Sequence, residues 1–108
     1  MKILFDQGTP APLRHSLTEH EIVTAFERGW QTLQNGELLQ AAEAAGFAAI
    51  VTTDKNLRYQ QNLSGRQLAI LVLMTTDWRL IRQHTDSVAK VIETLAPGAY
   101  FELSFPPP

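Results

Sequence analysis

Three short apolar runs of this chain each end in an aspartate, and these carboxylates are the residues that could do chemistry. The runs and the acids that follow them are residues 3–5 with Asp6, residues 48–53 with Asp54, and residues 70–76 with Asp77. Short apolar runs rich in β-branched residues are typical of buried parallel strands. Because the carboxyl ends of parallel strands lie along one edge of a sheet, and open α/β folds bind their ligands at that edge, the three acids are candidates for one site.

Glu37 is expected at the same edge, because a helix that follows a parallel strand begins where that strand ended. Glu37 lies in the first turn of a helix predicted over residues 36–45. Two like charges about 4 Å apart repel by about 4 kcal/mol at an effective dielectric constant of about 20, so a cluster of acids requires a bound cation or bound protons. Carboxylate oxygens without His or Cys suit Mg²⁺ or Mn²⁺. We therefore predict a Mg²⁺ or Mn²⁺ site whose ligands are Asp6, Glu37, Asp54 and Asp77.

Each of these acids also has a structural interpretation. An aspartate after a strand often forms a turn or caps a helix, and Asp77 could cap the helix predicted from Trp78. An acid in a first helical turn, as Glu37 is, interacts favourably with the helix dipole by about 0.3–1 kcal/mol. The coincidence of Asp6, Glu37 and Asp54 at one edge favours a ligand site over three separate structural roles.

The positions of these acids depend on an alternation of strands and helices. Strands are predicted from the apolar runs at residues 2–5, 22–25, 48–52, 69–74 and 100–105. Helices are predicted over residues 10–16, over residues 36–45 with Asn35 as N-cap, and, as the longest helix, from Trp78 to Leu95. The polar residues 55–65 predict a helical turn and a loop. This alternation indicates an α/β fold with a mainly parallel sheet between helices, in one domain that spans residues 1–108.

Composition limits the classes of protein to which this chain can belong. The 108 residues carry a formal net charge of −2 and contain no cysteine. Disulfides, thiolate chemistry and zinc–sulfur sites are therefore excluded, and no general positive field attracts nucleic acid. The N-terminus lacks the apolar stretch of a signal peptide, and no run approaches the roughly 18 apolar residues that span a membrane. We therefore expect a cytoplasmic protein without a membrane segment.

Four short motifs follow one another along nearly the whole chain. They are residues 3–7 (ILFDQ) with Pro10, residues 35–39 (NGELL) with Ala41 and Ala42, residues 51–57 (VTTDKNL), and residues 59–63 (YQQNL). Together they resemble the PIN-like nuclease superfamily, and specifically a family of short bacterial PIN-like proteins. The third motif is similar to that family's signature of a hydrophobic residue, Thr, any residue and Asp.

The resemblance implies a three-layer α/β/α PIN-like fold with a mainly parallel sheet of about five strands. Asp6, Glu37 and Asp54 match the acidic positions that hold Mg²⁺ or Mn²⁺ in the family, and Asp77 is a fourth candidate ligand. Many relatives cleave RNA, often as the toxin of a toxin–antitoxin pair. The resemblance therefore implies a metal-dependent ribonuclease in which Asp6, Glu37 and Asp54 are catalytic. It also implies RNA as substrate, with an antitoxin protein and a homodimer as candidate assemblies.

Polar and basic residues that follow Asp54 are candidates for binding the RNA. Lys55 or Arg58 could hold a phosphate group, and Asn56 or Gln60 could contact nucleotide edges or sugars. Each of these side chains also fits an ordinary solvent-exposed position.

Two other functions fit parts of the same pattern. A PIN-like scaffold without catalysis could bind a partner protein, using the predicted strand at residues 100–105 as an edge for pairing. A response-regulator receiver has acids after its first strand and an Asp after its third, as Asp6 and Asp54 are placed here. The receiver also needs an adjacent pair of acids after the first strand and a Lys after the fifth, whereas Asp6 stands alone and residues 100–105 contain no Lys.

Overall fold

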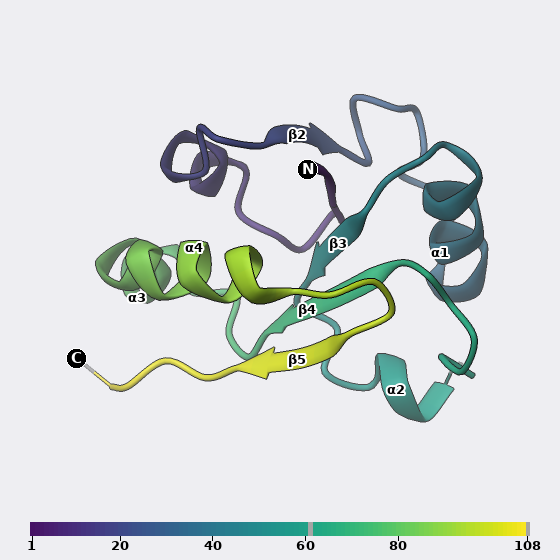
Figure 1. Cartoon of the computed structure of the whole chain (residues 1–108). Helices are drawn as coiled ribbons and strands as arrows, with labels where there is room; N and C mark the ends of the chain where they lie inside the picture. The colour runs from purple at the N-terminus through teal and green to yellow at the C-terminus, as the bar shows by residue number, and fades with distance from the viewer. Residues whose placement is uncertain (61, 108) are drawn as a thin grey trace.

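The computed structural model describes residues 1–60 and 62–107, apart from the side chains of Tyr59 and Gln60. Within these residues, five strands form one parallel sheet in the order β2-β1-β3-β4-β5 (Figure 1). The strands are β1 (Lys2–Phe5), β2 (Glu21–Thr24), β3 (Ala49–Thr52), β4 (Ala69–Leu73) and β5 (Tyr100–Leu103). This sheet confirms the predicted mainly parallel arrangement.

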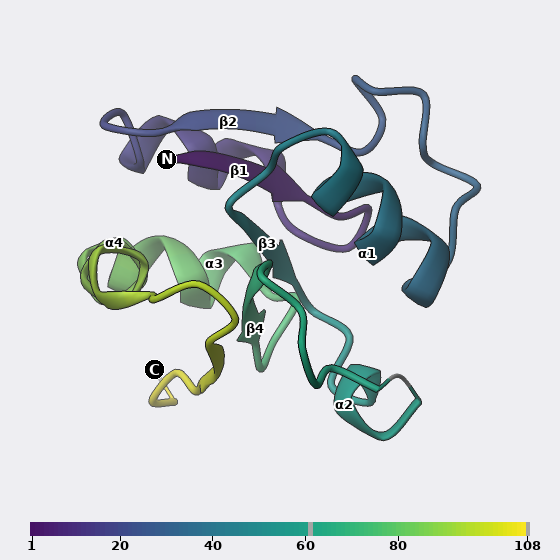
Figure 2. The ribbon, with the colours of Figure 1, turned by 45° about the vertical axis from the view of Figure 1, so that its right-hand side comes forward.

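Helices cover both faces of the sheet, which confirms the predicted three α/β/α layers (Figures 1 and 2). The helices on one face are the 3₁₀ helix η1 (Ala11–Ser16), α3 (Trp78–Ile81) and α4 (Thr85–Thr94). Those on the opposite face are α1 (Asn35–Ala44) and α2 (Leu57–Gln60).

The side chains of each strand alternate between the two faces, because successive residues of a strand point in opposite directions. In β1, Ile3 and Phe5 pack on the side of η1 and α4, while Leu4 packs on the side of α1. All three are fully buried. A central strand that is buried on both faces has an unbroken apolar sequence, which is why β1, β3 and β4 are legible in the sequence.

The connections between the strands do not all have the same hand. The β3–β4 and β4–β5 connections run in the same direction along the sheet. The β3–β4 connection crosses the face that α2 covers, whereas the β4–β5 connection crosses the opposite face through α3 and α4. The β1–β2 and β2–β3 connections agree in hand with β3–β4. About 98% of parallel crossovers are right-handed. If the three connections that agree are right-handed, the β4–β5 connection, which has the opposite hand, is left-handed. It brings α4 into contact with η1.

The long helix predicted from Trp78 to Leu95 is wrong, because the structure divides it. After α3 the chain forms a short 3₁₀ helix, η2 (Arg82–His84), before α4 begins. His84 has φ −133° and ψ 31°, which lie outside the helical range. Ile81 on one side of the break and Val88 on the other both still face the core, so the apolar spacing contains no sign of the interruption.

The predicted N-cap of α1 is also wrong. Helix α1 begins at Asn35, and its N-cap is Gln34, whose backbone is extended. The Gln34 carbonyl oxygen accepts the N–H groups of Glu37 at 2.9 Å and Leu38 at 3.2 Å, as the oxygen of an N-cap residue does. Asn35 has φ 29°, a region that Asn tolerates better than most residues. Glu37 lies in the first turn, as predicted.

Strand β5 is shorter than predicted and ends at Leu103. Phe105 packs instead against the core on the side of α4, with its ring centre 6.1 Å from that of His84. The other predicted ends of strands and helices differ from the observed ones by at most about two residues.

Candidate functional site

The candidate site lies at the carboxyl ends of β1 and β3, which are neighbours in the sheet. The chain passes from β1 to β2 on one side, while β3 lies on the other side of β1, so the strand order reverses at this point. Open parallel sheets bind their ligands at such a switch point. Asp6 directly follows β1, and Asp54 comes shortly after β3. The fold therefore brings these two predicted residues to the same part of the sheet edge.

Asp6 is partly buried, and its carboxylate accepts several hydrogen bonds. Thr9 Oγ1 donates to Asp6 Oδ1 at 2.8 Å, and the hydroxyl of Thr52 donates to Asp6 Oδ2. The backbone N–H groups of Gly8 and Thr9 also donate to this carboxylate. Burial raises the pKa of Asp6, and these hydrogen bonds only partly oppose the rise. The carboxylate is thus held in one orientation, while its charge is less well stabilised than in water.

Thr52 joins the residues that carry the two carboxylates. Its hydroxyl donates to Asp6 and accepts the N–H of Asp54, with an N···O distance of 3.1 Å. Thr52 is only 2% exposed, so these two bonds are protected from water. Asp54 Oδ1 in turn accepts the N–H of Asn56 at 3.0 Å, which closes a local turn. One buried hydroxyl therefore links the carboxylate of Asp6 to the backbone of Asp54.

The tripeptide Thr-Thr-Asp occurs twice, first at the end of β3, whose last residue is Thr52, and again shortly after β4. In the second copy, Thr75 Oγ1 accepts the N–H of Asp77 at 3.1 Å, just as Thr52 accepts that of Asp54. Among the residues that the structure describes, only the Thr52 hydroxyl of this pair also donates to a carboxylate. The two copies therefore share one local turn but have different surroundings.

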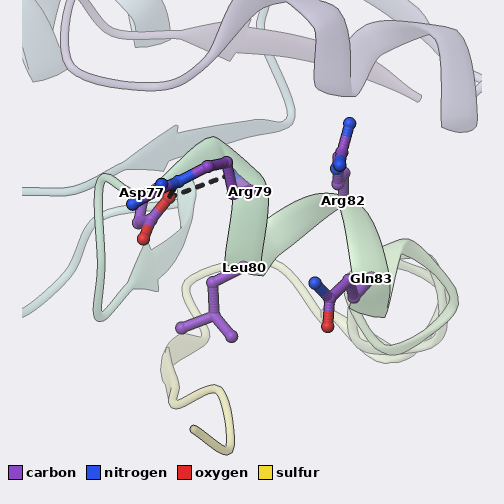
Figure 3. Close-up of a pocket in the computed structure, with 5 residues that line it drawn as sticks. All are labelled: Asp77, Arg79, Leu80, Arg82 and Gln83. Atoms are coloured by element: carbon purple, nitrogen blue, oxygen red, sulfur yellow. Dashed lines mark hydrogen bonds and ion pairs between the residues drawn. The ribbon is translucent and has the colours of Figure 1, made fainter. Parts of the chain in front are cut away.

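Asp77 serves as the N-cap of α3. Its Oδ1 accepts the backbone N–H of Arg79 at 2.9 Å and lies 3.4 Å from Arg79 Nε. The hydrogen bond from Arg79 holds the pKa of Asp77 below its ordinary value. Figure 3 shows Arg79 lying against Asp77, while Arg82 extends away from both. This placement favours the helix-capping interpretation of Asp77 over a role as a metal ligand.

A hollow of about 370 Å³ lies beside α3 rather than beside Asp6 (Figure 3). Its lining residues are Asp77, Arg79, Leu80, Arg82 and Gln83. Its one carboxylate is already paired with Arg79, so this hollow offers no free acid for the predicted chemistry.

The four predicted metal ligands do not form one cluster. Across residues 1–60 and 62–107, no three Asp, Glu or His side chains lie close enough together to hold a metal ion. Glu37 is exposed on the first turn of α1, and Asp77 is tied to Arg79. Mg²⁺ commonly takes one or two carboxylates and completes its shell with water and substrate phosphate. A site on Asp6 and Asp54 would be of this smaller kind and not a cage of four carboxylates.

A second hollow, of about 250 Å³, lies beside Asp6. Its lining residues are Asp6, Gln7, Thr9, Ala11, Arg14, Thr24, Phe26 and Glu27. They come from the segment after β1 and from the turn after β2, so the hollow opens at the same sheet edge as the switch point.

An ion pair that the sequence analysis missed forms part of the wall of this second hollow. Arg14 donates to the two carboxylate oxygens of Glu27 at 2.8 and 3.3 Å and to the carbonyl oxygen of Ile22 at 2.7 Å. The hydrogen bond from Arg14 lowers the pKa of Glu27 to about 2. Thr24 and Glu27 exchange hydrogen bonds of 2.9 and 3.1 Å between side chain and backbone. The sequence signal was present, because Thr-x-x-Glu at residues 24–27 is the pattern of a capping box.

The predicted RNA-binding residues differ in their availability. Lys55 and Asn56 are exposed on the turn after Asp54. Arg58 Nε lies 3.6 Å from Glu102 Oε2, so a phosphate group at Arg58 would compete with this acid. The side chain of the fourth candidate, Gln60, lies outside the described residues.

Comparison with known proteins identifies no relative. No model of a protein family, no curated protein and no solved structure matches this chain. None of the described helices is long and apolar enough to cross a membrane.

Proposed function

We propose that this chain is a cytoplasmic ribonuclease that depends on Mg²⁺ or Mn²⁺ and is centred on Asp6 and Asp54. The observation that carries the proposal is the position of these two acids at the switch point of a parallel sheet, joined through the buried hydroxyl of Thr52. The raised pKa of Asp6 supports it, because a partly buried carboxylate is poorly stabilised as an anion until a cation approaches.

The residues of the site would have distinct roles. Asp6 and Asp54 would hold the cation, which when bound neutralises charge on a phosphodiester and acidifies water. Thr9 and Thr52 would keep the carboxylate of Asp6 in one orientation. Lys55, exposed immediately after Asp54, would attract an RNA phosphate as a point charge.

Calorimetric titration with Mn²⁺ tests the cation site. We expect the wild-type protein to bind Mn²⁺ and the variants Asp6→Asn and Asp54→Asn to lose this binding while they keep their circular dichroism spectra. An Asn at position 54 retains a side-chain oxygen for the N–H of Asn56, so the turn should persist. Asp77→Asn is the matched control, because it changes the acid of the second Thr-Thr-Asp copy. Equal affinity in all four proteins would contradict the proposal.

Cleavage of a panel of RNA oligonucleotides tests the activity itself. We expect Mn²⁺-dependent cleavage by the wild type and by Asp77→Asn, and none by Asp6→Asn. Products should be absent when EDTA replaces Mn²⁺. Cleavage that survives in Asp6→Asn would assign the activity to a contaminant or to another site.

A scaffold that binds a partner protein without catalysis is the second candidate. It is favoured by the observation that the Asp6 carboxylate already receives hydroxyl and backbone donors, while the described residues contain no group of three acids. Under this alternative the protein ignores Mn²⁺ and leaves every RNA uncut. The Mn²⁺ titration and the cleavage assay therefore separate the two functions.

A further inference from the structure

Phe26 is the most exposed large apolar side chain in the described residues, with 72% of its surface in solvent, and it lines the hollow that contains Asp6. The other exposed large apolar side chains, Met1 and Phe101, are 43% and 44% exposed and do not line this hollow. A single exposed aromatic residue is ordinary in a soluble protein. Phe26 differs from an ordinary exposed residue because it lines the same hollow as Asp6, a candidate catalytic acid.

The turn that carries Phe26 is held on both sides. The N–H of Ala25 donates to the carbonyl oxygen of Phe5, the last residue of β1, at 2.8 Å. The N–H of Glu27 donates to Thr24 Oγ1 at 3.1 Å. The backbone at Phe26 is thus fixed relative to the end of β1, so its ring is presented without a large loss of chain entropy on binding.

The hollow beside Phe26 is lined by this one aromatic ring and by the charged groups of Asp6, Arg14 and Glu27. Glu27 lies 2.8 Å from Arg14 and balances its charge. A nucleotide offers a base to the ring of Phe26 and a phosphate group to the cation that Asp6 would hold.

We infer that Phe26 is a stacking platform for one base of a single-stranded RNA segment, in a nucleotide subsite formed by the hollow beside Asp6. This inference rests on the proposed function, since the phosphate next to that base is the one that Asp6 would serve. Every base has a π-face, so stacking on an aromatic ring favours unpaired RNA without selecting a sequence. Bases inside a duplex are already stacked and cannot reach the ring.

Fluorescence anisotropy with a labelled, unstructured oligouridine tests the subsite. The RNA carries phosphorothioate linkages and Mn²⁺ is present, so the cation site is available while cleavage is slowed. The proteins compared are the wild type, Phe26→Ala, Phe26→Tyr and the control Phe101→Ala, which removes the other exposed phenylalanine from the far edge strand β5. We expect Phe26→Ala to weaken binding by about 5- to 150-fold, which corresponds to about 1–3 kcal/mol for one stacked base. Phe26→Tyr and Phe101→Ala should bind as the wild type does.

Four results would overturn the inference: wild-type affinity in Phe26→Ala, equal weakening by Phe26→Ala and Phe101→Ala, equal competition by duplex RNA, or no binding of RNA by the wild type. A dimer in light scattering that disappears in Phe26→Ala would also overturn it, by assigning the ring to a protein contact. Mn²⁺ titration separates this failure from that of the proposed function. If Mn²⁺ binding and cleavage still depend on Asp6 while Phe26→Ala keeps the wild-type KM, the subsite is wrong and the ribonuclease stands.

Discussion

Replacing Thr52 by valine is the sharpest test of the contact between the two halves of the site. Valine has nearly the shape of threonine and fits a β-strand, so Thr52→Val removes the hydroxyl without opening a cavity. Two hydrogen bonds are lost: the one that Thr52 donates to the carboxylate of Asp6 and the one that it accepts from the N–H of Asp54. Both lie in a region protected from solvent, because Thr52 is 2% exposed.

The expected loss of stability follows from the two bonds. A hydrogen bond to a charged group contributes about 1.5–3 kcal/mol and a neutral one about 0.5–1.5 kcal/mol, so Thr52→Val should lower the free energy of unfolding by about 2–4.5 kcal/mol near pH 7. With an unfolding entropy of about 2.1 cal/mol/K per residue, a chain of 108 residues loses about 9–20 °C in Tm.

The loss should depend on pH. The pKa of Asp6 is raised above its ordinary value of 3.8 by burial, so the native protein holds this proton to higher pH than the unfolded chain does. The contribution of Asp6 to stability is therefore fully present below about pH 3.8 and is lost as the pH rises through the native pKa. Thr52→Val removes a donor that lowers this pKa, so the fall should become larger and extend to higher pH. Near pH 3 the carboxyl is protonated in both proteins, and the difference in stability should shrink toward that of the neutral bond.

Urea denaturation at about pH 3 and about pH 7 measures these differences, and carbon NMR of the Asp6 carboxyl follows its titration directly. Thr75→Val is the matched control, because Thr75 accepts the N–H of Asp77 in the same local turn. Its cost should be smaller than that of Thr52→Val and should not change between the two pH values. Equal losses for the two variants at about pH 7, or a loss in Thr52→Val that ignores pH, would refute the contact with Asp6.

Three further predictions concern other parts of the molecule. NMR should show the Glu27 carboxyl with a pKa of about 2, and Arg14→Lys should move this pKa back toward 4.5. The stabilisation from this pair is present above pH 4.5 and is lost as the pH falls toward about 2. An unmoved pKa in the variant would contradict the role of Arg14. Gly46→Ala and Gly98→Ala both place a Cβ at positive φ, which should lower the free energy of unfolding by about 1–2 kcal/mol. At Gly98 the new Cβ would also lie 2.7 Å from a backbone oxygen, so urea denaturation should show a further loss of about 1–3 kcal/mol for that variant. A larger loss for Gly46→Ala than for Gly98→Ala would contradict the packing. Leu71 in β4 is fully buried, so Leu71→Ala should cost about 2–5 kcal/mol by the same measurement, and a loss below about 1 kcal/mol would mean that the sheet is less closely packed.

Much of the fold could be predicted from the sequence because central parallel strands are buried on both faces. The runs at residues 2–5 and 69–74 are apolar at every or nearly every position, and both are strands. The break of the helix after Ile81 could not be predicted, because Val88 continues the same apolar face beyond it. The apolar periodicity indicates only which side chains face the core. The change of backbone conformation at His84 does not alter which side chains these are, so the periodicity does not reveal it.

The candidate site was predictable in position and not in composition. Asp6 and Asp54 had to lie near one sheet edge once β1 and β3 were parallel. The sequence could not show that Glu37 would remain exposed or that Asp77 would pair with Arg79, because the direction of a side chain depends on its own turn and on its partners. The directions of the Glu37 and Asp77 side chains, and not the order of the strands, exclude these two acids from a site with Asp6 and Asp54.

By itself the sequence determined the features of local structure that depend on a few neighbouring residues or on a repeated apolar pattern. It contains the strands, the two Thr-Thr-Asp turns and the Thr24–Glu27 capping pattern, since each depends on neighbours along the chain. Only the tertiary structure decided that Thr52 donates to Asp6 across 46 positions, that the β4–β5 connection crosses on the face of η1, and that Phe26 lines a hollow with Asp6. These features depend on distances between remote segments, which packing sets and which local chemistry does not encode.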